Sequence, residues 1–297
     1  MQNVHKDLKK RGIDMAIILD GKKVAAKVKA EVKAEIEQNG YTPTLCVFRV
    51  GSDPASETYV KNKTKDCEEC GIGTKTYEFK ETNTIDLLNH IRRENLKFDT
   101  DGILVQLPLP GNINQDAIIQ SISGHKDVDC FCDSNAGALY AGHQLFAPCT
   151  PSGIIRLLDE YNIDIEGKHC VVIGRSNIVG KPTAAMLLER GGTVTVCHSK
   201  TTNLAEYTKS ADILVSAIGK PRFITADMVK EGAVVIDVGI NRDKHGKLCG
   251  DVDYDDVFKK AGYITPVPGG VGLMTRAMLM INTLKAYKIK NGIVCSR

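Results

Sequence analysis

The sequence has no apolar run long enough to cross a membrane, no export signal and no excess of one charge. The apolar stretch after the polar residues 1–14, Met15 to Leu19, is too short for the core of a signal peptide. Its 39 basic and 36 acidic residues are spread along the chain and give a net charge of +3. That balance does not indicate a nucleic-acid or membrane surface, so we expect a cytoplasmic protein with neither as partner.

The chain contains ten cysteines. Without an export signal they are expected to be reduced thiols rather than a disulfide framework. Cys67 and Cys70 form a C-x-x-C pair, and Cys130 and Cys132 add two thiols, so a zinc or thiol-redox protein is one alternative. The first pair falls late in a predicted helix rather than on a knuckle turn. Structural cysteines are therefore the simpler interpretation, and no metal is expected.

The 297 residues suggest about two domains, and no internal repeat or low-complexity segment is present. Strand-like runs alternate with helical stretches, which predicts an α/β protein with parallel sheets. The six expected strands are Thr44–Val50, Gly102–Leu107, Cys170–Gly174, Thr193–Cys197, Ile213–Ile218 and Ala233–Val238.

Two Pro-containing segments suggest domain boundaries. Thr150 can cap a helix whose first position is Pro151. A Pro/Gly cluster at residues 266–270 precedes an apolar helix from Leu273 to Tyr287. We expect an N-terminal α/β domain of residues 1–150, completed by a C-terminal helix at 273–297. Residues 151–272 would form a second, Rossmann-like domain.

The segment Gly174 to Pro182 (GRSNIVGKP) follows a buried strand and precedes a helix. Gly174 permits a tight turn, Gly180 permits close packing, and a helix N-terminus offers amide donors to a pyrophosphate. Ser176 stands where a second glycine is usual, so the dinucleotide fingerprint is only partly met.

The next strand ends at Cys197-His198-Ser199-Lys200, with no Asp or Glu for a ribose hydroxyl. Arg175 and Ser199 can instead bind a 2′-phosphate, which favours NADP over NAD. Lys200 is equally well explained as a solvated charge.

In the first domain, Asp53-Pro54 predicts a helix start and Gly71 its end. Tyr59 and Lys63 lie four residues apart on one face of this helix, so the phenol can hydrogen-bond the amine. By spacing alone, an ordinary amphipathic helix face explains the pair better.

Gln106 favours a functional interpretation, because it interrupts the apolar run GILVQLPLP at the carboxyl end of a buried strand. Asp129 in KDVD is a further candidate that could also be a turn residue.

Six motifs in order resemble those of the bifunctional methylenetetrahydrofolate dehydrogenase/methenyltetrahydrofolate cyclohydrolase family. The resemblance covers nearly the whole chain, from Met15 to about Tyr287. The motifs are SETYVKNK from Ser56, GILVQLPLP from Gly102, KDVD from Lys126, TPSG from Thr150, GRSNIVGKP from Gly174 and TPVPGGVG from Thr265. The resemblance implies NADP-dependent oxidation of methylenetetrahydrofolate and hydrolysis of the methenyl product to formyltetrahydrofolate. This chemistry belongs to one-carbon metabolism and purine biosynthesis.

The resemblance also implies a homodimer whose active-site cleft lies between a catalytic and a cofactor domain. Lys63 would be the key catalytic residue, with Tyr59, Gln106 and Asp129. The folate would contact Tyr59, Val105, Gln106, Leu107, Asp129, Pro268, Gly269, Gly270 and Gly272. NADP would contact Gly174, Arg175, Ser176, Ser199 and Ile240.

The sequence departs from the family after Asp129, where Gly-Phe-His-Pro is usual and Cys130-Phe131-Cys132-Asp133 stands here. A dehydrogenase of similar architecture acting on another small substrate is the second alternative. Such an enzyme would keep the Gly174 turn without needing Tyr59, Lys63, Gln106 and Asp129 together.

Overall fold

The computed structural model describes residues 15–293, which form two compact units. One contains Ala25–Cys149 and the described residues from Arg276 onward. The other contains Thr150–Thr275 and the described residues up to Val24. Residues 1–14 and the last four residues of the predicted C-terminal helix lie outside the described range. Between residues 15 and 293, no helix has both the length and the apolar character of a membrane span.

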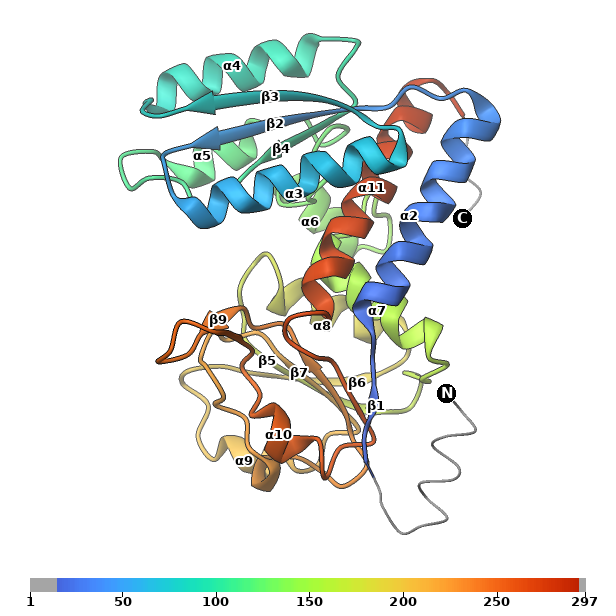
Figure 1. The fold of residues 1–297 in the computed structure, drawn as a ribbon, viewed down its shortest axis with the longest axis vertical. Helices are drawn as coiled ribbons and strands as arrows, with labels where there is room; N and C mark the ends of the chain where they lie inside the picture. The colour runs from blue at the N-terminus through green and yellow to red at the C-terminus, as the bar shows by residue number, and fades with distance from the viewer. Residues whose placement is uncertain (1–14, 294–297) are drawn as a thin grey trace. The chain divides into compact units, whose positions relative to one another are not determined.

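The unit containing Ala25–Cys149 is built on a parallel sheet in the order β3 (Gly73–Phe79), β2 (Thr44–Val50), β4 (Gly102–Val105). Figure 1 shows α3 and α4 on opposite faces of this sheet. The helices with residues in this unit are α2 (Gly21–Asn39), α3 (Pro54–Cys70), α4 (Thr84–Leu96), α5 (Gln115–Gln120), α6 (Asp133–Tyr140) and α11 (Val271–Lys290).

Strand alternation gives this sheet two separate cores. Leu45 and Val47 of β2 face a cluster that includes Val60 and Cys67 of α3. Phe48 lies on the other face, in a cluster with residues of α4 and α5. Because both faces are covered, β2 and β4 are apolar along almost their whole length, which explains why the sequence revealed them.

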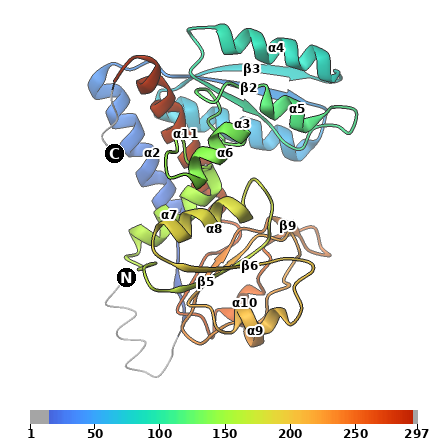
Figure 2. The ribbon, with the colours of Figure 1, turned by 180° about the vertical axis from the view of Figure 1, so that it is seen from behind.

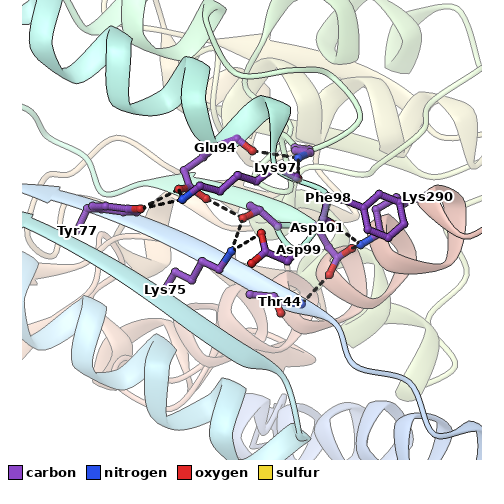
Figure 3. Close-up of polar contacts among 11 residues, drawn as sticks. Thr44, Lys75, Tyr77, Glu94, Lys97, Phe98, Asp99, Asp101 and Lys290 are labelled. Atoms are coloured by element: carbon purple, nitrogen blue, oxygen red, sulfur yellow. Dashed lines mark hydrogen bonds and ion pairs between the residues drawn. The ribbon is translucent and has the colours of Figure 1, made fainter.

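A polar cluster closes the amino ends of these strands (Figure 3). The buried carboxylate of Glu94 accepts hydrogen bonds from Tyr77, Lys97 and Thr100 at 2.6–2.7 Å. The carboxylate of Asp101 accepts the backbone N–H of Thr44 at 2.7 Å and forms an ion pair with Lys290 of α11. The cluster joins both edges of the sheet at the end opposite Gln106.

The second unit is built on a parallel sheet in the order β1 (Ile17–Ile18), β11 (Tyr263–Ile264), β8 (Val234–Asp237), β7 (Ile213–Ser216), β5 (His169–Ile173), β6 (Thr193–Cys197). Figure 2 shows α8 lying over β5 and β6. The remaining elements are α7 (Cys149–Glu160), α8 (Gly180–Glu189), α9 (Leu204–Thr208), a 3-10 turn η1 (Ala226–Met228), β9 (Asn241–Arg242), β10 (Leu248–Cys249) and α10 (Tyr254–Val257).

The chain crosses from β6 to β7 on the far side of β5. This reversal of winding makes the carboxyl ends of β5 and β7 the topological switch point of a Rossmann-like sheet. The predicted α/β fold with a Rossmann-like domain is thereby confirmed.

The first strand joins this second sheet, although residues 1–150 were expected to form the N-terminal domain. β1 pairs with β11, and Leu19 N–H donates to the Ile264 carbonyl at 2.8 Å. The two-residue strand is too short to be predicted from an apolar pattern. The functions assigned to residues 1–150 with 273–297 and to 151–272 stay predictions.

The predicted ends of α3 are confirmed. Asp53 is its N-cap, Pro54 its first residue, and Gly71 follows its last turn at φ +79°. Two other starts were placed too late, since α7 begins at Cys149 and α8 at Gly180.

Candidate active site

Helix α3 carries Lys63, and contacts at two places hold the helix. At its start, the Asp53 carboxylate accepts the Ser56 N–H and hydroxyl at 2.9 and 2.8 Å, and these bonds lower the pKa of Asp53. Further along, the buried Asp66 carboxylate accepts two hydrogen bonds from the Arg276 guanidinium, at 2.5 and 2.9 Å. This bidentate pair one turn after Lys63 fixes the position of α3.

The amine of Lys63 meets Gln106 at the carboxyl end of β4. Lys63 Nζ donates to Gln106 Oε1 at 3.1 Å. The amide of Gln106 donates to the Leu107 carbonyl at 2.7 Å, so its oxygen faces the lysine. Gln106 N–H also donates to Phe48 on the neighbouring strand, at 2.8 Å. The bonds to Leu107 and Phe48 thus hold Gln106 independently of its bond with Lys63.

Asp129 lies within electrostatic range of Lys63. Burial raises the pKa of the Asp129 carboxyl, the positive charge of Lys63 acts against that rise, and Asp127 reinforces it. The thiol of Cys149 is hydrogen-bonded to the same carboxyl. Lys63, Gln106 and Asp129 therefore form one polar group inside the first unit, with Cys149 as a member that the sequence did not reveal.

The expected hydrogen bond from Tyr59 to Lys63 is absent from the described part of the chain. Tyr59 shares the helix face, but its side chain is 36% exposed, and the amine turns to Gln106 instead. An exposed aromatic ring beside a polar group suits stacking on a planar ligand. Val105 is buried at the end of β4, and Leu107 follows Gln106 with partial exposure.

In the second unit, the turn after β5 requires glycine at two positions. Gly174 has φ +122°, and a Cβ there would lie 2.4 Å from the Ala217 carbonyl oxygen at the end of β7. A Cβ on Gly180 would lie 2.2 Å from the carbonyl oxygen of Gly174. The turn is therefore pressed against the switch point, and neither glycine tolerates a side chain.

Ser176 makes two hydrogen bonds at the start of α8, and its contact with NADP stays a prediction. Its hydroxyl accepts the N–H groups of Val179 and Gly180 at 3.2 and 3.3 Å, which starts α8 two residues before Pro182. Within residues 15–293, the four amides of residues 175–178 donate to no acceptor. These amides, rather than the capped helix end, are the donors available to a pyrophosphate.

Arg175 and Ser199 lie at one edge of the sheet, each two residues beyond the paired residues Ile173 and Cys197. Both side chains are exposed. Residues 198–200, which follow β6, include no acidic residue. In this turn the His198 ring accepts the backbone N–H of Lys200 at 3.1 Å. The arrangement leaves a cation and a hydroxyl available for a phosphate.

Ile240 and Gly272 approach each other within the second unit. Ile240 follows β8 with 51% exposure, and its Cδ1 lies 3.5 Å from where a Cβ of Gly272 would stand. Gly270 is packed against the Pro266 carbonyl, and the Val267–Pro268 peptide bond is cis. Gly269 has φ +112° and accepts the N–H of Lys22 at 3.0 Å. Ile240, a predicted NADP contact, therefore lies beside Gly272, which was predicted to contact the folate.

The cysteines give no support to the zinc or thiol-redox alternative. The nine cysteines of the described range are buried and form no disulfide. Burial raises the pKa of the Cys70 thiol to about 12 and that of Cys67 further, which disfavours the thiolate that metals and disulfides require. Residues 15–293 contain no group of three potential metal ligands.

Two family models match the chain. The model for the catalytic domain of tetrahydrofolate dehydrogenase/cyclohydrolase matches residues 19–129, and that for its NAD(P)-binding domain matches residues 148–291.

Curated relatives and solved structures agree with this match. The bifunctional protein FolD of Lachnoclostridium phytofermentans is 56% identical over 92% of this chain and 99% of the relative, and that of Bacillus cereus is 54% identical over 95% and 99%. The FolD crystal structure from Campylobacter jejuni matches with 50% identity and a TM-score of 0.90, covering 92% of this chain and 99% of that one. The Trypanosoma brucei enzyme, complexed with NADP and an inhibitor, matches with 37% identity and a TM-score of 0.88, covering 93% and 98%.

Proposed function

The chain belongs to the tetrahydrofolate dehydrogenase/cyclohydrolase family, and we propose that Lys63, held by Gln106 beside Asp129, is the centre of its folate chemistry. The enzyme oxidises methylenetetrahydrofolate with NADP and hydrolyses the methenyl product to formyltetrahydrofolate. The observation that carries the site assignment is the 3.1 Å hydrogen bond from Lys63 to Gln106.

Hydrolysis requires removal of a proton from the attacking water, and Lys63 suits this task. A neutral amine can accept that proton directly or orient a water that loses it. Gln106 accepts one N–H of the Lys63 amine. This bond restricts the directions in which the other N–H group and the lone pair of the neutral amine can point. Once the amine of Lys63 has accepted the proton, the Asp129 carboxylate can balance its positive charge.

Binding of the folate would use the rest of this group. We assign the pterin to Asp129, whose carboxylate can accept from ring N–H and amino groups. Tyr59 would stack on the ring, while Val105 and Leu107 provide apolar contact beside Gln106. The segment containing Pro268, Gly269, Gly270 and Gly272 would bind the substrate on the side of Ile240.

The residues of the second unit fit NADP. The turn at Gly174 has no room for a Cβ, and in the part of the chain that the structure describes the amides of residues 175–178 donate to no acceptor. Arg175 and Ser199 would hold the 2′-phosphate, and Ser176 would shape the turn by capping α8. When bound, the nicotinamide supplies a hydride acceptor, so the protein's task in that step is alignment.

We further propose that the enzyme is a homodimer and is cytoplasmic, with its product entering purine biosynthesis. The nine buried cysteines of the described residues form no disulfide, which supports a reducing compartment. Dimerisation is supported by family membership alone. Light scattering that gave a monomer mass at micromolar concentration would contradict it.

The experiment that tests the function is turnover of methylenetetrahydrofolate by the purified protein with NADP and with NAD, followed by absorbance. Decay of the methenyl product measures the hydrolytic step. Activity in both assays is expected. Absence of both, with a correctly folded protein, would refute the proposal.

A further inference from the structure

Two buried carboxylates lie at the carboxyl edge of the second sheet, and neither has a cationic partner among the described residues. Asp251 is 0% exposed and Asp237 is 3% exposed. Within residues 15–293, the donors to these two carboxylates are backbone N–H groups, one hydroxyl and one side-chain amide, and no Lys, Arg or His side chain is among them. Burying unpaired carboxylates is costly unless hydrogen bonds surround them. Their retention calls for a structural or functional reason.

Asp251 joins the loops that follow β7 and β8. Its carboxylate accepts five hydrogen bonds, between 2.8 and 3.3 Å, from the Ser216 hydroxyl, the backbone N–H groups of Ile218, Gly219 and Lys220, and the Asn241 side chain. Three consecutive amides of one loop and a side chain of another therefore converge on a single residue. Such a node sets the spacing between the two loops.

Asp237, the last residue of β8, completes the node. Its carboxylate accepts the N–H groups of Gly239, Asp251 and Val252, each at 2.9 Å. Its own N–H donates to the Thr265 hydroxyl at 2.7 Å, immediately before the segment that holds Gly269 to Gly272. The two carboxylates thus tie together three loops at one edge of the sheet.

Glycines on this edge fit the carboxylates closely. A Cβ on Gly239 would lie 2.2 Å from Asp251 Oδ1, and a Cβ on Gly250 would lie 1.8 Å from Asp237 Oδ2. Either side chain would displace the carboxylate from its donors. The position of the loops is therefore determined by the carboxylates and by the absence of side chains beside them.

Ile240 lies between the two anchors. Gly239, which precedes it, is bonded to Asp237, and Asn241, which follows it, is bonded to Asp251. Its backbone is fixed on both sides while its side chain remains half exposed. Ile240 is also the proposed contact for the nicotinamide end of NADP, where small displacements reduce the rate of hydride transfer strongly.

We propose that Asp251 and Asp237 are positioning residues for the dehydrogenase reaction, which hold the loops around Ile240 so that the nicotinamide of NADP is aligned for hydride transfer. The proposal rests on the proposed function, since it assumes that Ile240 meets the nicotinamide. The proposal concerns only the nicotinamide end of the cofactor. The adenosine 2′-phosphate would depend on Arg175 and Ser199, which this node does not contact.

The test compares Asp251→Asn with Asp243→Asn. Asp243, on the turn between β9 and β10, also accepts two backbone N–H groups, from His245 and Lys247, but joins no other loop. Asp251→Asn keeps the shape and replaces one acceptor oxygen by an NH2 group that faces N–H donors. We expect its dehydrogenase kcat/KM for NADP to fall about 10- to 100-fold, with a loss in kcat. Asp243→Asn should match the unmodified enzyme.

Two further measurements separate positioning from general damage. Calorimetric affinity for 2′,5′-ADP, which carries only the adenosine end, and the rate of methenyltetrahydrofolate hydrolysis should stay within about twofold in Asp251→Asn, because neither uses the nicotinamide end. Equal losses in all three measurements, or an unchanged dehydrogenase rate, would overturn the proposal.

If Asp251→Asn fails to fold, Asn241→Ala removes a single donor to the same carboxylate and should give the same pattern more weakly. An unmodified protein with no folate turnover would refute the proposed function instead.

Discussion

Lys63 Nζ donates a 3.1 Å hydrogen bond to Gln106 Oε1, and this bond joins helix α3 to the carboxyl end of β4. The amide of Gln106 is fixed in turn by the Leu107 carbonyl. The long, flexible side chain of Lys63 is thereby held at the edge of the sheet by a neutral acceptor. A proton acceptor for a bound folate requires this kind of restraint.

Replacing Lys63 by Met should abolish most of the cyclohydrolase activity, because the stem volume is kept while the basic nitrogen is lost. We expect a fall of about two to four orders of magnitude in the decay rate of the methenyl compound. The hydride step depends on alignment and should fall less. Lys61→Met, two residues away and exposed, is the matched control and should hydrolyse normally. A Lys63→Met enzyme that folds, binds folate and hydrolyses at the normal rate would exclude Lys63 as the base.

Arg175→Ala should reduce the preference for NADP over NAD. Loss of a hydrogen bond to a charged group costs about 1.5–3 kcal/mol, which corresponds to a fall of about 10- to 100-fold in kcat/KM for NADP. The value for NAD should change by no more than about threefold, since NAD lacks the 2′-phosphate. Lys200→Ala serves as the control, because it removes a cation from the neighbouring turn. Equal efficiency with both cofactors in the unmodified enzyme would contradict this account.

The sequence predicts the buried framework well because burial leaves an apolar pattern. β2 and β8 have apolar neighbours on both faces and stand out as continuous apolar runs. The start of α3 was equally clear, since Asp53 and Pro54 act through residues next to them in the chain. The Gly174 turn was recognised for the same reason, since its shape depends on local backbone freedom.

The missed features depend on long-range contacts or on exposed surface. β3 is an edge strand of seven residues whose alternating polar side chains resemble a loop. Helical spacing placed Tyr59 and Lys63 on one face, but could not show that Gln106, 43 positions later, would take the amine's hydrogen bond. Asp237 left one signal, a carboxylate ending an apolar strand, whereas its partner Asp251 left none.

Stability should depend on pH through Asp237. Burial raises its pKa to about 6 from an ordinary 3.8, with Asp251 adding to the rise and backbone N–H groups opposing it. Between these two values the folded state binds more protons than the unfolded state, so this group's contribution to stability decreases as pH rises and is constant above about 6. The size of the decrease is about 3 kcal/mol.

Asp237→Asn removes the titration, so it isolates this effect. The free energy of unfolding of the unmodified protein minus that of the variant should therefore fall from pH 4 to pH 6 in denaturant titrations. A difference that stays constant over this range would show that Asp237 has an ordinary pKa. Asp243→Asn, on the exposed turn, controls for changes in net charge.

Glu94→Gln should destabilise the first unit without impairing catalysis. The buried carboxylate accepts from Tyr77, Lys97 and Thr100, and an amide cannot serve all three donors. We expect a loss of about 2–3 kcal/mol in the free energy of unfolding. Thr100 and Asp101 of this cluster precede β4, whereas Gln106 follows it, so kcat should be unchanged. Glu37→Gln, which removes an exposed surface pair with Lys33, should cost less than about 0.5 kcal/mol.

Cys130 stands where the family usually has glycine, and the structure gives a physical test of that departure. Its φ is +62°, a left-handed conformation that is unfavourable for any residue with a Cβ, and its buried thiol donates to the Phe146 carbonyl at 3.3 Å.

Cys130→Ala loses the thiol contact and keeps the strained Cβ, whereas Cys130→Gly loses the contact and relieves the strain. Cys130→Gly should therefore be more stable than Cys130→Ala by about 1 kcal/mol, the reverse of the order on ordinary backbone. Chemical denaturation of the two variants measures this difference directly. The exposed Ala141, at φ −84°, provides the control, because glycine there should reduce stability. If Cys130→Ala proves the more stable variant, a left-handed backbone does not explain why the family usually has glycine at this position.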